Sequence, residues 1–137
     1  MIRQAVLSDI PRLLDMGQRF ADRAGLVDHV GYNPADMAET FRLMIEGHVI
    51  FIGEAGALGA MSGPHPFNYR HIIAQELFWW SEGREGLRLL AAFEDWARGR
   101  CHSIRMITLE AVEPDRTARI YERRGYQALE RGFMKVL

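Results

Sequence analysis

The feature that most restricts the fold of this chain is a strand-like run that passes through a short turn directly into a helical pattern. Residues 71–80 form the longest strand-like run, and residues 81–86 hold two glycines. Apolar residues then recur at three- and four-residue intervals up to Ala97, which is typical of a helix with one buried face. A strand that is followed directly by an amphipathic helix indicates a sheet with helices packed on it, because the helix must bury its apolar face. The sequence therefore predicts an α/β (α+β) architecture.

Further strands and helices are expected on both sides of this unit. In chain order they are a strand at 2–6, a helix from 8 to 23, a helix from 34 to 47, a hairpin of strands at 48–53 and 57–61, a loop at 63–68, the central strand and helix, a strand at 103–111, a helix at 114–123, and a last strand from 125 to about 136. Ser8 and Asn33 are predicted to cap their helices, and Gly25 to end the first one. No linker or repeat divides the chain, so we expect a single domain over residues 1–137.

Composition excludes several classes of protein. The formal net charge is −1, so no overall positive field favours nucleic acid or an anionic membrane as a partner. Apolar runs are far shorter than the roughly 20 residues that cross a bilayer. The lone Cys101 cannot form an intrachain disulfide, and no export signal opens the sequence, which favours the cytoplasm. The five histidines lack metal-ligand spacing, so no metal is predicted.

Two segments of the second half resemble the GNAT superfamily of N-acetyltransferases. The first is the strand, turn and helix of residues 76–97. The second, from Asp115 to Tyr126, is similar to the family's Asn-x-x-Ala-x-x-x-Tyr-x-x-x-Gly-Phe segment, with Asp115 in place of asparagine and Tyr126 in place of phenylalanine. The resemblance covers essentially the whole chain. It implies a central mixed and splayed sheet of about six strands flanked by about four helices, and acetyl-CoA as co-substrate.

The turn after the central strand departs from the family pattern. It is shorter than usual, and Ser81, Arg84 and Gly86 occupy the places of the family's Gln or Arg, middle glycine and last glycine. Main-chain amides at a helix N-terminus bind phosphate without any cationic side chain, so a shorter turn can still serve. By resemblance, the residues that hold acetyl-CoA are Phe78, Trp79, Trp80, Gly83, Arg84, Gly86, Leu87 and Arg88.

The turn and the start of the following helix contain charges of both signs. Glu82 and Glu85 would add negative charge where the phosphates sit. Arg84 and Arg88 are four residues apart, and we expect them on one helical face, where they would offset that charge.

The resemblance also implies catalytic roles for Tyr121 and Glu76. Tyr121 would protonate the departing thiolate of coenzyme A, and Glu76 would remove the proton of the substrate ammonium. Each residue has an alternative reading. Tyr121 is also suited to pack its ring on the sheet, and Glu76, which shares strand parity with Phe78 and Trp80, is also suited to a structural salt bridge. Glu110 is an alternative base.

Other candidates have structural readings of equal or greater weight. The tryptophan pair could wall an acceptor pocket but is more typical of a core, and Cys101 is more typical of a small buried filler than of a nucleophile. Three arginines on the last helix would either reach the coenzyme A phosphate or lie on a solvated face: Arg116, Arg119 and Arg123.

The sequence therefore predicts an N-acetyltransferase that carries acetyl from acetyl-CoA to a primary amine in a direct ternary complex. The acceptor is a small-molecule or peptide amine that the sequence does not specify. The alternative is a catalytically silent GNAT-like module that binds acyl-CoA or a protein. A homodimer is a further expectation that no particular residue supports.

Overall fold

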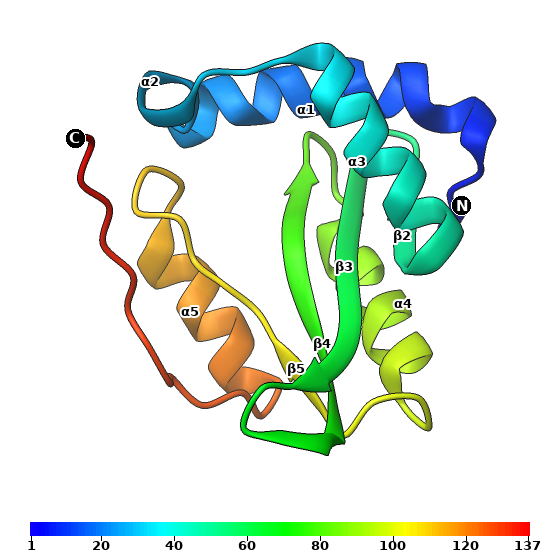
Figure 1. Ribbon diagram of the computed structural model, residues 1–137, viewed down its shortest axis with the longest axis vertical. Helices are drawn as coiled ribbons and strands as arrows, with labels where there is room; N and C mark the ends of the chain where they lie inside the picture. The colour runs from blue at the N-terminus through cyan, green and yellow to red at the C-terminus, as the bar shows by residue number, and fades with distance from the viewer.

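A five-stranded mixed sheet forms the centre of the protein, and the computed structural model describes residues 1–137 (Figure 1). The strands, in both chain and spatial order, are β1 (Arg3–Gln4), β2 (Val49–Ile52), β3 (Gly56–His65), β4 (Asn68–Ser81) and β5 (Ser103–Arg105). Neighbouring strands are antiparallel except for β4 and β5, which are parallel. A parallel pair needs a crossover connection, and the helix that follows β4 provides it.

Helices cover both faces of this sheet. They are α1 (Ile10–Ala24), α2 (Val27–Val30), α3 (Pro34–Gly47), α4 (Gly86–Ala97) and α5 (Pro114–Arg123), with a 3₁₀ turn, η1 (Leu7–Asp9), before α1. One apolar cluster joins α1 and α3 to the sheet through Leu13, Phe41 and Met44. The other joins α4 and α5 to the opposite face through Leu90, Phe93 and Tyr121. The central strand β4 thus lies between two layers of helices, and the central helix α4 belongs to one of them.

The helix ends largely follow the local sequence signals. Asn33 caps α3 by accepting a hydrogen bond from the Asp36 amide at 3.1 Å, and Gly25 ends α1 in the left-handed conformation, with φ of 70°. The predicted cap at Ser8 is wrong, because Ser8 lies inside η1. The carboxylate of Asp9 instead accepts the Val6 amide at 2.8 Å.

A β-bulge at Leu77 interrupts β4. On β3, Gly59 pairs with Phe78 but the next residue, Ala60, pairs with Glu76, so Leu77 has no partner. One extra residue turns the following side chains to the other face of the sheet. Ala74 accordingly lies in the cluster under α4 and α5, whereas Phe78 and Trp80 lie in the cluster under α1 and α3. The expectation that Glu76 shares a face with Phe78 and Trp80 is therefore wrong.

The hairpin before the bulge is longer than the sequence suggests. Residues 63–68 are not a loop, because β3 runs to His65 and β4 begins at Asn68. Pro64 is tolerated within β3 because β2 begins at Val49, opposite Ala60, so the part of β3 after Ala60 has a partner on one side only.

The C-terminal end differs most from the prediction. No strand forms after Gly125, so the sheet has five strands rather than about six, and the short α2 raises the helices from about four to five. The last eleven residues make no backbone hydrogen bond from their amides and run past α5 as an exposed segment (Figure 1). Side-chain pairs tie the segment to its neighbours, Glu130 with Arg105 at 2.8 Å and Arg131 with Glu110 at 3.4 Å. Without a ladder partner this segment does not form a strand.

Candidate functional site

The site forms where β4 and β5 separate. Their parallel pairing covers only three residues on each strand and stops at Gln75 opposite Arg105. Beyond that point the Glu76 carboxylate, not the β4 main chain, accepts the Ile107 amide, at 3.0 Å. The predicted strand at 103–111 is therefore shortened to Ser103–Arg105. The main chain of β4 from Glu76 to Ser81 is left without a strand on its β5 side, which opens a wedge beside the bulge.

Glu76 occupies the apex of this wedge as a buried acid without a counter-ion. Only 5% of the residue is exposed, and no basic side chain pairs with it, so the reading of Glu76 as a salt-bridged residue is wrong. Burial raises the pKa of Glu76 to about 7, because an ionised carboxylate loses its hydration there; the single bond from the Ile107 amide opposes this only in part. Near neutral pH the side chain can therefore both accept and release a proton.

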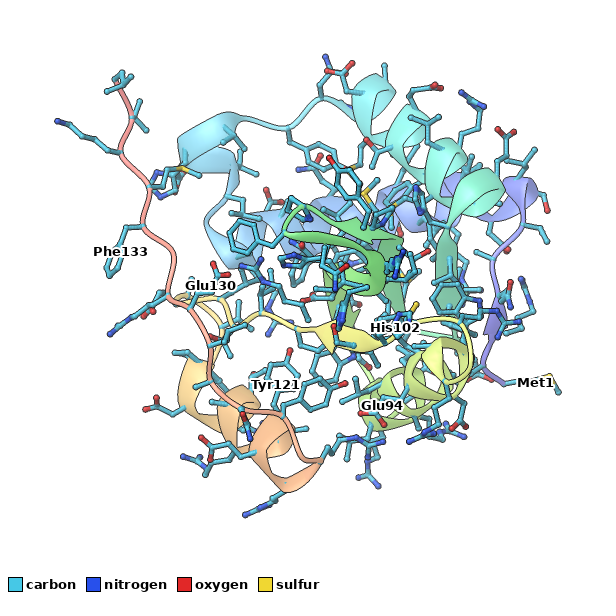
Figure 2. All side chains as sticks on the ribbon, turned by 60° about the horizontal axis from the view of Figure 1, so that its bottom comes forward. Met1, Glu94, His102, Tyr121, Glu130 and Phe133 are labelled. Carbon is cyan, nitrogen blue, oxygen red and sulfur yellow. The ribbon has the colours of Figure 1, made fainter.

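Tyr121 reaches the same point from the opposite side. It projects from α5 toward the chain that follows β5 (Figure 2), and its hydroxyl donates to the Ile107 carbonyl at 2.7 Å. Its ring lies 5.9 Å from that of Trp79. Burial, and then the nearby Glu76, raise the pKa of the Tyr121 phenol above its usual value, so the hydroxyl keeps its proton at physiological pH. Glu76 and Tyr121 thus bind the two polar groups of one peptide residue.

The far end of β4 leads into a row of open amides. The amides of residues 84–88 make no hydrogen bond within the protein, as expected where a loop enters α4. Trp79 lines the approach, and its indole nitrogen donates to the Gly86 carbonyl at 3.2 Å. Five consecutive free donors at a helix N-terminus form a group that can bind an anion such as a diphosphate.

The two acidic residues of the turn do not obstruct these amides. Glu82 pairs with Arg19 of α1 at 2.7 Å. Glu85 is buried and turns toward the connection between β2 and β3, where it accepts the amides of Glu54 and Ala55 at 3.2 and 2.6 Å. The expectation that both charges oppose a phosphate is therefore wrong, because both are bound to other parts of the fold.

The basic residues of the turn are placed less regularly than the sequence suggests. Arg84 precedes the first residue of α4, so it does not share a helical face with Arg88 as expected. Both side chains are exposed and form no ion pair within the protein. Gly83 and Leu87 are likewise exposed beside the open amides.

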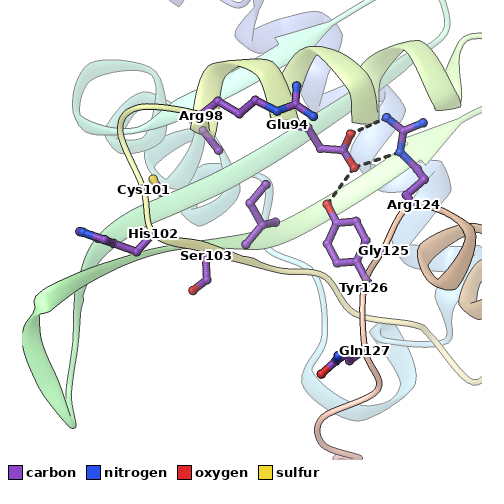
Figure 3. Close-up of a pocket in the computed structure, with 11 residues that line it drawn as sticks. Glu94, Arg98, Cys101, His102, Ser103, Arg124, Gly125, Tyr126 and Gln127 are labelled. Atoms are coloured by element: carbon purple, nitrogen blue, oxygen red, sulfur yellow. Dashed lines mark hydrogen bonds and ion pairs between the residues drawn. The ribbon is translucent and has the colours of Figure 1, made fainter.

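The protein has two main hollows, and one of them borders this arrangement. One of about 380 Å³ opens beside Glu76 and Leu77 and is lined further by residues of the β3–β4 hairpin and its surroundings: His48, Met61, Ser62, Gly63, Pro64, Pro66, Ile73 and Gln75. It contains no basic side chain other than histidine. The other, of about 480 Å³, lies at the far end of α4 (Figure 3). There Arg124 donates to Glu94 at 2.9 Å and Tyr126 donates to the same carboxylate at 3.1 Å, which ties α4 to the end of α5.

The remaining candidates lie apart from the wedge. The side chains of Phe78 and Trp80 are buried under α1 and α3, so these residues face the wedge only through their main chain, whereas Trp79 faces it with its ring. Glu110 is exposed and contacts Arg131. Cys101 is half-buried, and burial raises the pKa of its thiol. The three arginines of α5 are exposed. No three or more His, Cys, Asp or Glu side chains group closely enough to hold a metal ion, and no helix is both long and apolar enough to cross a membrane.

Sequence reasoning missed Ile107 and Gly53. Ile107 joins Glu76 to Tyr121 through its main chain, which leaves no signal in the side-chain pattern. Gly53 makes room for the Glu85 carboxylate. The glycine-bearing turn at 53–56 is visible in the sequence, but its contact with a residue some thirty positions later is not.

Comparison with solved structures identifies the fold of this protein, whereas comparison with family models and curated proteins finds no match. Among solved structures, a predicted acetyltransferase of Clostridium acetobutylicum with acetyl-CoA shares 16% identity at a TM-score of 0.73, over 98% of this chain and 94% of its own. An aminoglycoside acetyltransferase from an uncultured soil metagenomic sample shares 13% at 0.73, over 100% and 97%. A transcriptional regulator of Bacillus halodurans C-125 shares 21% at 0.72, over 100% and 99%. At such identities the likeness establishes the architecture: the protein has the fold of the GNAT acetyltransferases.

Proposed function

We propose that this protein transfers an acetyl group from acetyl-CoA to a primary amine, with both substrates bound at once. The observation that carries the proposal is the wedge between β4 and β5, which has a buried acid of pKa about 7 at its apex and free amides at its far end. A proton acceptor and an anion site at the two ends of one exposed strand suit a thioester substrate that carries a diphosphate at its other end.

In this proposal acetyl-CoA lies along β4. Its diphosphate accepts the free amides of residues 84–88, with Arg84 and Arg88 beside it. The pantetheine arm then follows the unpaired main chain from Ser81 to Glu76, a distance of about 17 Å for an extended strand. This brings the thioester to the bulge, where the β4 main chain past Glu76 has no strand partner on this side and can donate to the developing oxyanion.

The protons then move through the two residues bonded to Ile107. Glu76 takes a proton from the substrate ammonium, and the neutral amine attacks the thioester carbon, so that the C–N bond forms and the C–S bond breaks. The departing thiolate takes the proton of the Tyr121 hydroxyl, and the proton lost by the new amide nitrogen restores the phenol. The products are the acetylated amine, coenzyme A as its thiol, and one proton that Glu76 releases to solvent. Tyr121 must exchange its bond to the Ile107 carbonyl for one to sulfur during this step.

The acceptor amine approaches through the hollow of about 380 Å³ beside Glu76 and Leu77. Apart from Glu76 and His48, its lining is apolar or polar without an ionisable side chain, which suits a small molecule or a short peptide end. The solved structures of this fold bear names that include an aminoglycoside acetyltransferase and a ribosomal-protein-alanine N-acetyltransferase, so the fold itself does not select the acceptor.

Calorimetry with acetyl-CoA, followed by an assay of thiol release over a panel of amines, tests the proposal. We expect one binding site for acetyl-CoA and amine-dependent release of thiol that Glu76→Gln abolishes, while the variant still binds acetyl-CoA. Absence of binding would remove the transferase assignment.

The second candidate is a module that binds acyl-CoA without turnover. The Tyr121 hydroxyl, already bonded to a main-chain carbonyl, favours it, because the only proton of the candidate acid is engaged. A solved structure of this fold is named a transcriptional regulator, which supports a role outside catalysis. Binding of acetyl-CoA with no thiol release from any amine would favour this candidate.

A further inference from the structure

The connection between β2 and β3 holds a side chain that would otherwise compete for the proposed anion site. Glu85 immediately precedes α4, at the N-cap position, where a negatively charged side chain is attracted to the first free amides of the helix. Such a cap would fill the amides that the proposed function assigns to a diphosphate. The side chain of Glu85 makes no hydrogen bond to α4.

The carboxylate of Glu85 is bonded to a different element. Its two oxygens accept the amides of Glu54 and Ala55, at 3.2 and 2.6 Å, and only 4% of the residue is exposed. A buried carboxylate is costly unless it is hydrogen-bonded, and no basic side chain pairs with this one. The two main-chain donors of the turn are therefore what holds the charge in this position.

Gly53 makes the space for this contact. A Cβ built on Gly53 would lie 2.5 Å from both Cδ and Oε1 of Glu85, closer than van der Waals contact permits. The clash is with the end of a flexible side chain, so a residue larger than glycine would expel the carboxylate and leave the backbone in place.

The same turn is anchored from its other side. Arg12 of α1 donates to the Gly53 carbonyl at 2.5 Å and also to the Glu54 carbonyl. The Glu82 amide donates to the Ala55 carbonyl at 2.8 Å, which joins the turn a second time to the loop before α4. The turn is thus fixed in position before any ligand binds.

We propose that Gly53 and Glu85 form a latch, in which the turn at 53–55 holds the Glu85 carboxylate away from α4 and so keeps the amides of residues 84–88 open for the cofactor diphosphate. This inference rests on the proposed function. Glu85 is a positioning residue, because it acts on the amides and does not touch the cofactor. The latch explains how a turn that has Arg84 in place of the family's middle glycine can carry an acidic residue beside an anion site.

A double-mutant cycle tests the latch, with affinity for coenzyme A measured by calorimetry. In Gly53→Ala the expelled carboxylate is free to cap α4, and we expect affinity to fall by about tenfold or more. In Glu85→Ala no competing acid remains, so affinity falls less. Adding Glu85→Ala to Gly53→Ala should restore affinity to that of Glu85→Ala alone, because the new methyl group then meets no carboxylate.

Controls separate the latch from general damage. Gly47→Ala makes the same change where a Cβ would meet nothing, and Glu122→Ala removes an exposed glutamate of α5; both should bind as the wild type does. Urea unfolding reports whether each variant is folded, and Glu85→Gln serves if Glu85→Ala is not. Where turnover is measurable, Gly53→Ala should raise KM for acetyl-CoA and leave kcat within about twofold.

The outcomes are distinguishable. Wild-type affinity in Gly53→Ala, or losses that add in the double variant, would overturn the latch and leave the proposed function standing. A wild-type protein that does not bind coenzyme A would overturn the proposed function, and the latch with it.

Discussion

Replacing Glu76 by glutamine should stabilise the protein at alkaline pH while it abolishes turnover. The pKa of this buried carboxyl is raised from 4.5 to about 7. The folded protein therefore holds the proton more tightly than the unfolded chain does, and the stability that the protonated acid contributes is lost as the pH rises through about 7. Glutamine keeps an oxygen for the Ile107 amide, keeps the volume, and never ionises.

The size of the effect follows from the shift. A pKa raised by this much corresponds to about 3 kcal/mol when the acid is fully ionised. Between about pH 5 and pH 8 the wild type should lose about 2 to 3 kcal/mol relative to Glu76→Gln. Urea unfolding of both proteins at a series of pH values measures this, with Glu122→Gln as a control on an exposed glutamate. A stability difference between wild type and Glu76→Gln that does not change with pH would refute the account of Glu76 as a buried acid without a counter-ion.

Three further changes should have effects of known direction. The kcat/KM of the wild type should fall as the pH drops below about 7, because Glu76 must be ionised to act as the base; a flat profile across pH 5 to 8 would exclude Glu76 from that role. Tyr121→Phe should lower kcat by about 100-fold, with KM for acetyl-CoA little changed, whereas unchanged turnover would leave the ring only a packing role. Arg124→Met should cost about 2 kcal/mol in urea unfolding, since it leaves the buried Glu94 carboxylate with Tyr126 alone, and a loss below 0.5 kcal/mol would contradict this.

The sequence predicts those parts of the fold that local signals specify. The predicted cap at Asn33 and the predicted helix end at Gly25 are confirmed, because each depends on the type of the residue itself. The predicted strand, turn and helix at 71–97 are confirmed, because alternate residues of the strand from Ala74 to Trp80 are buried and the helix is amphipathic. The extra residue at Leu77 is invisible in a strand pattern, since a bulge depends on the register with β3, and it reverses the face on which Glu76 was expected.

In the candidate site, too, the sequence predicts which residues take part but not the contacts between distant segments. The sequence predicts Glu76 and Tyr121 as site residues, and the structure brings both to one peptide residue. Their common partner is a main-chain group, which no residue pattern marks. The sequence predicts the charge of Glu85 at the anion site, because its neighbours in the sequence are there. The structure places its side chain against the distant turn at 53–55 instead. The sequence predicts a last strand after Gly125, but the local pattern does not supply a ladder partner, and no strand forms there.

The most direct test of the account is a titration of ¹⁵N-labelled protein with acetyl-CoA, followed by amide chemical shifts. The account predicts that the largest shifts fall on the amides of residues 84–88, with a second group along β4 from Leu77 to Trp80, and that inorganic pyrophosphate shifts only the first group. Shifts confined to the hollow at the far end of α4, or none at these amides under saturating acetyl-CoA, would contradict it.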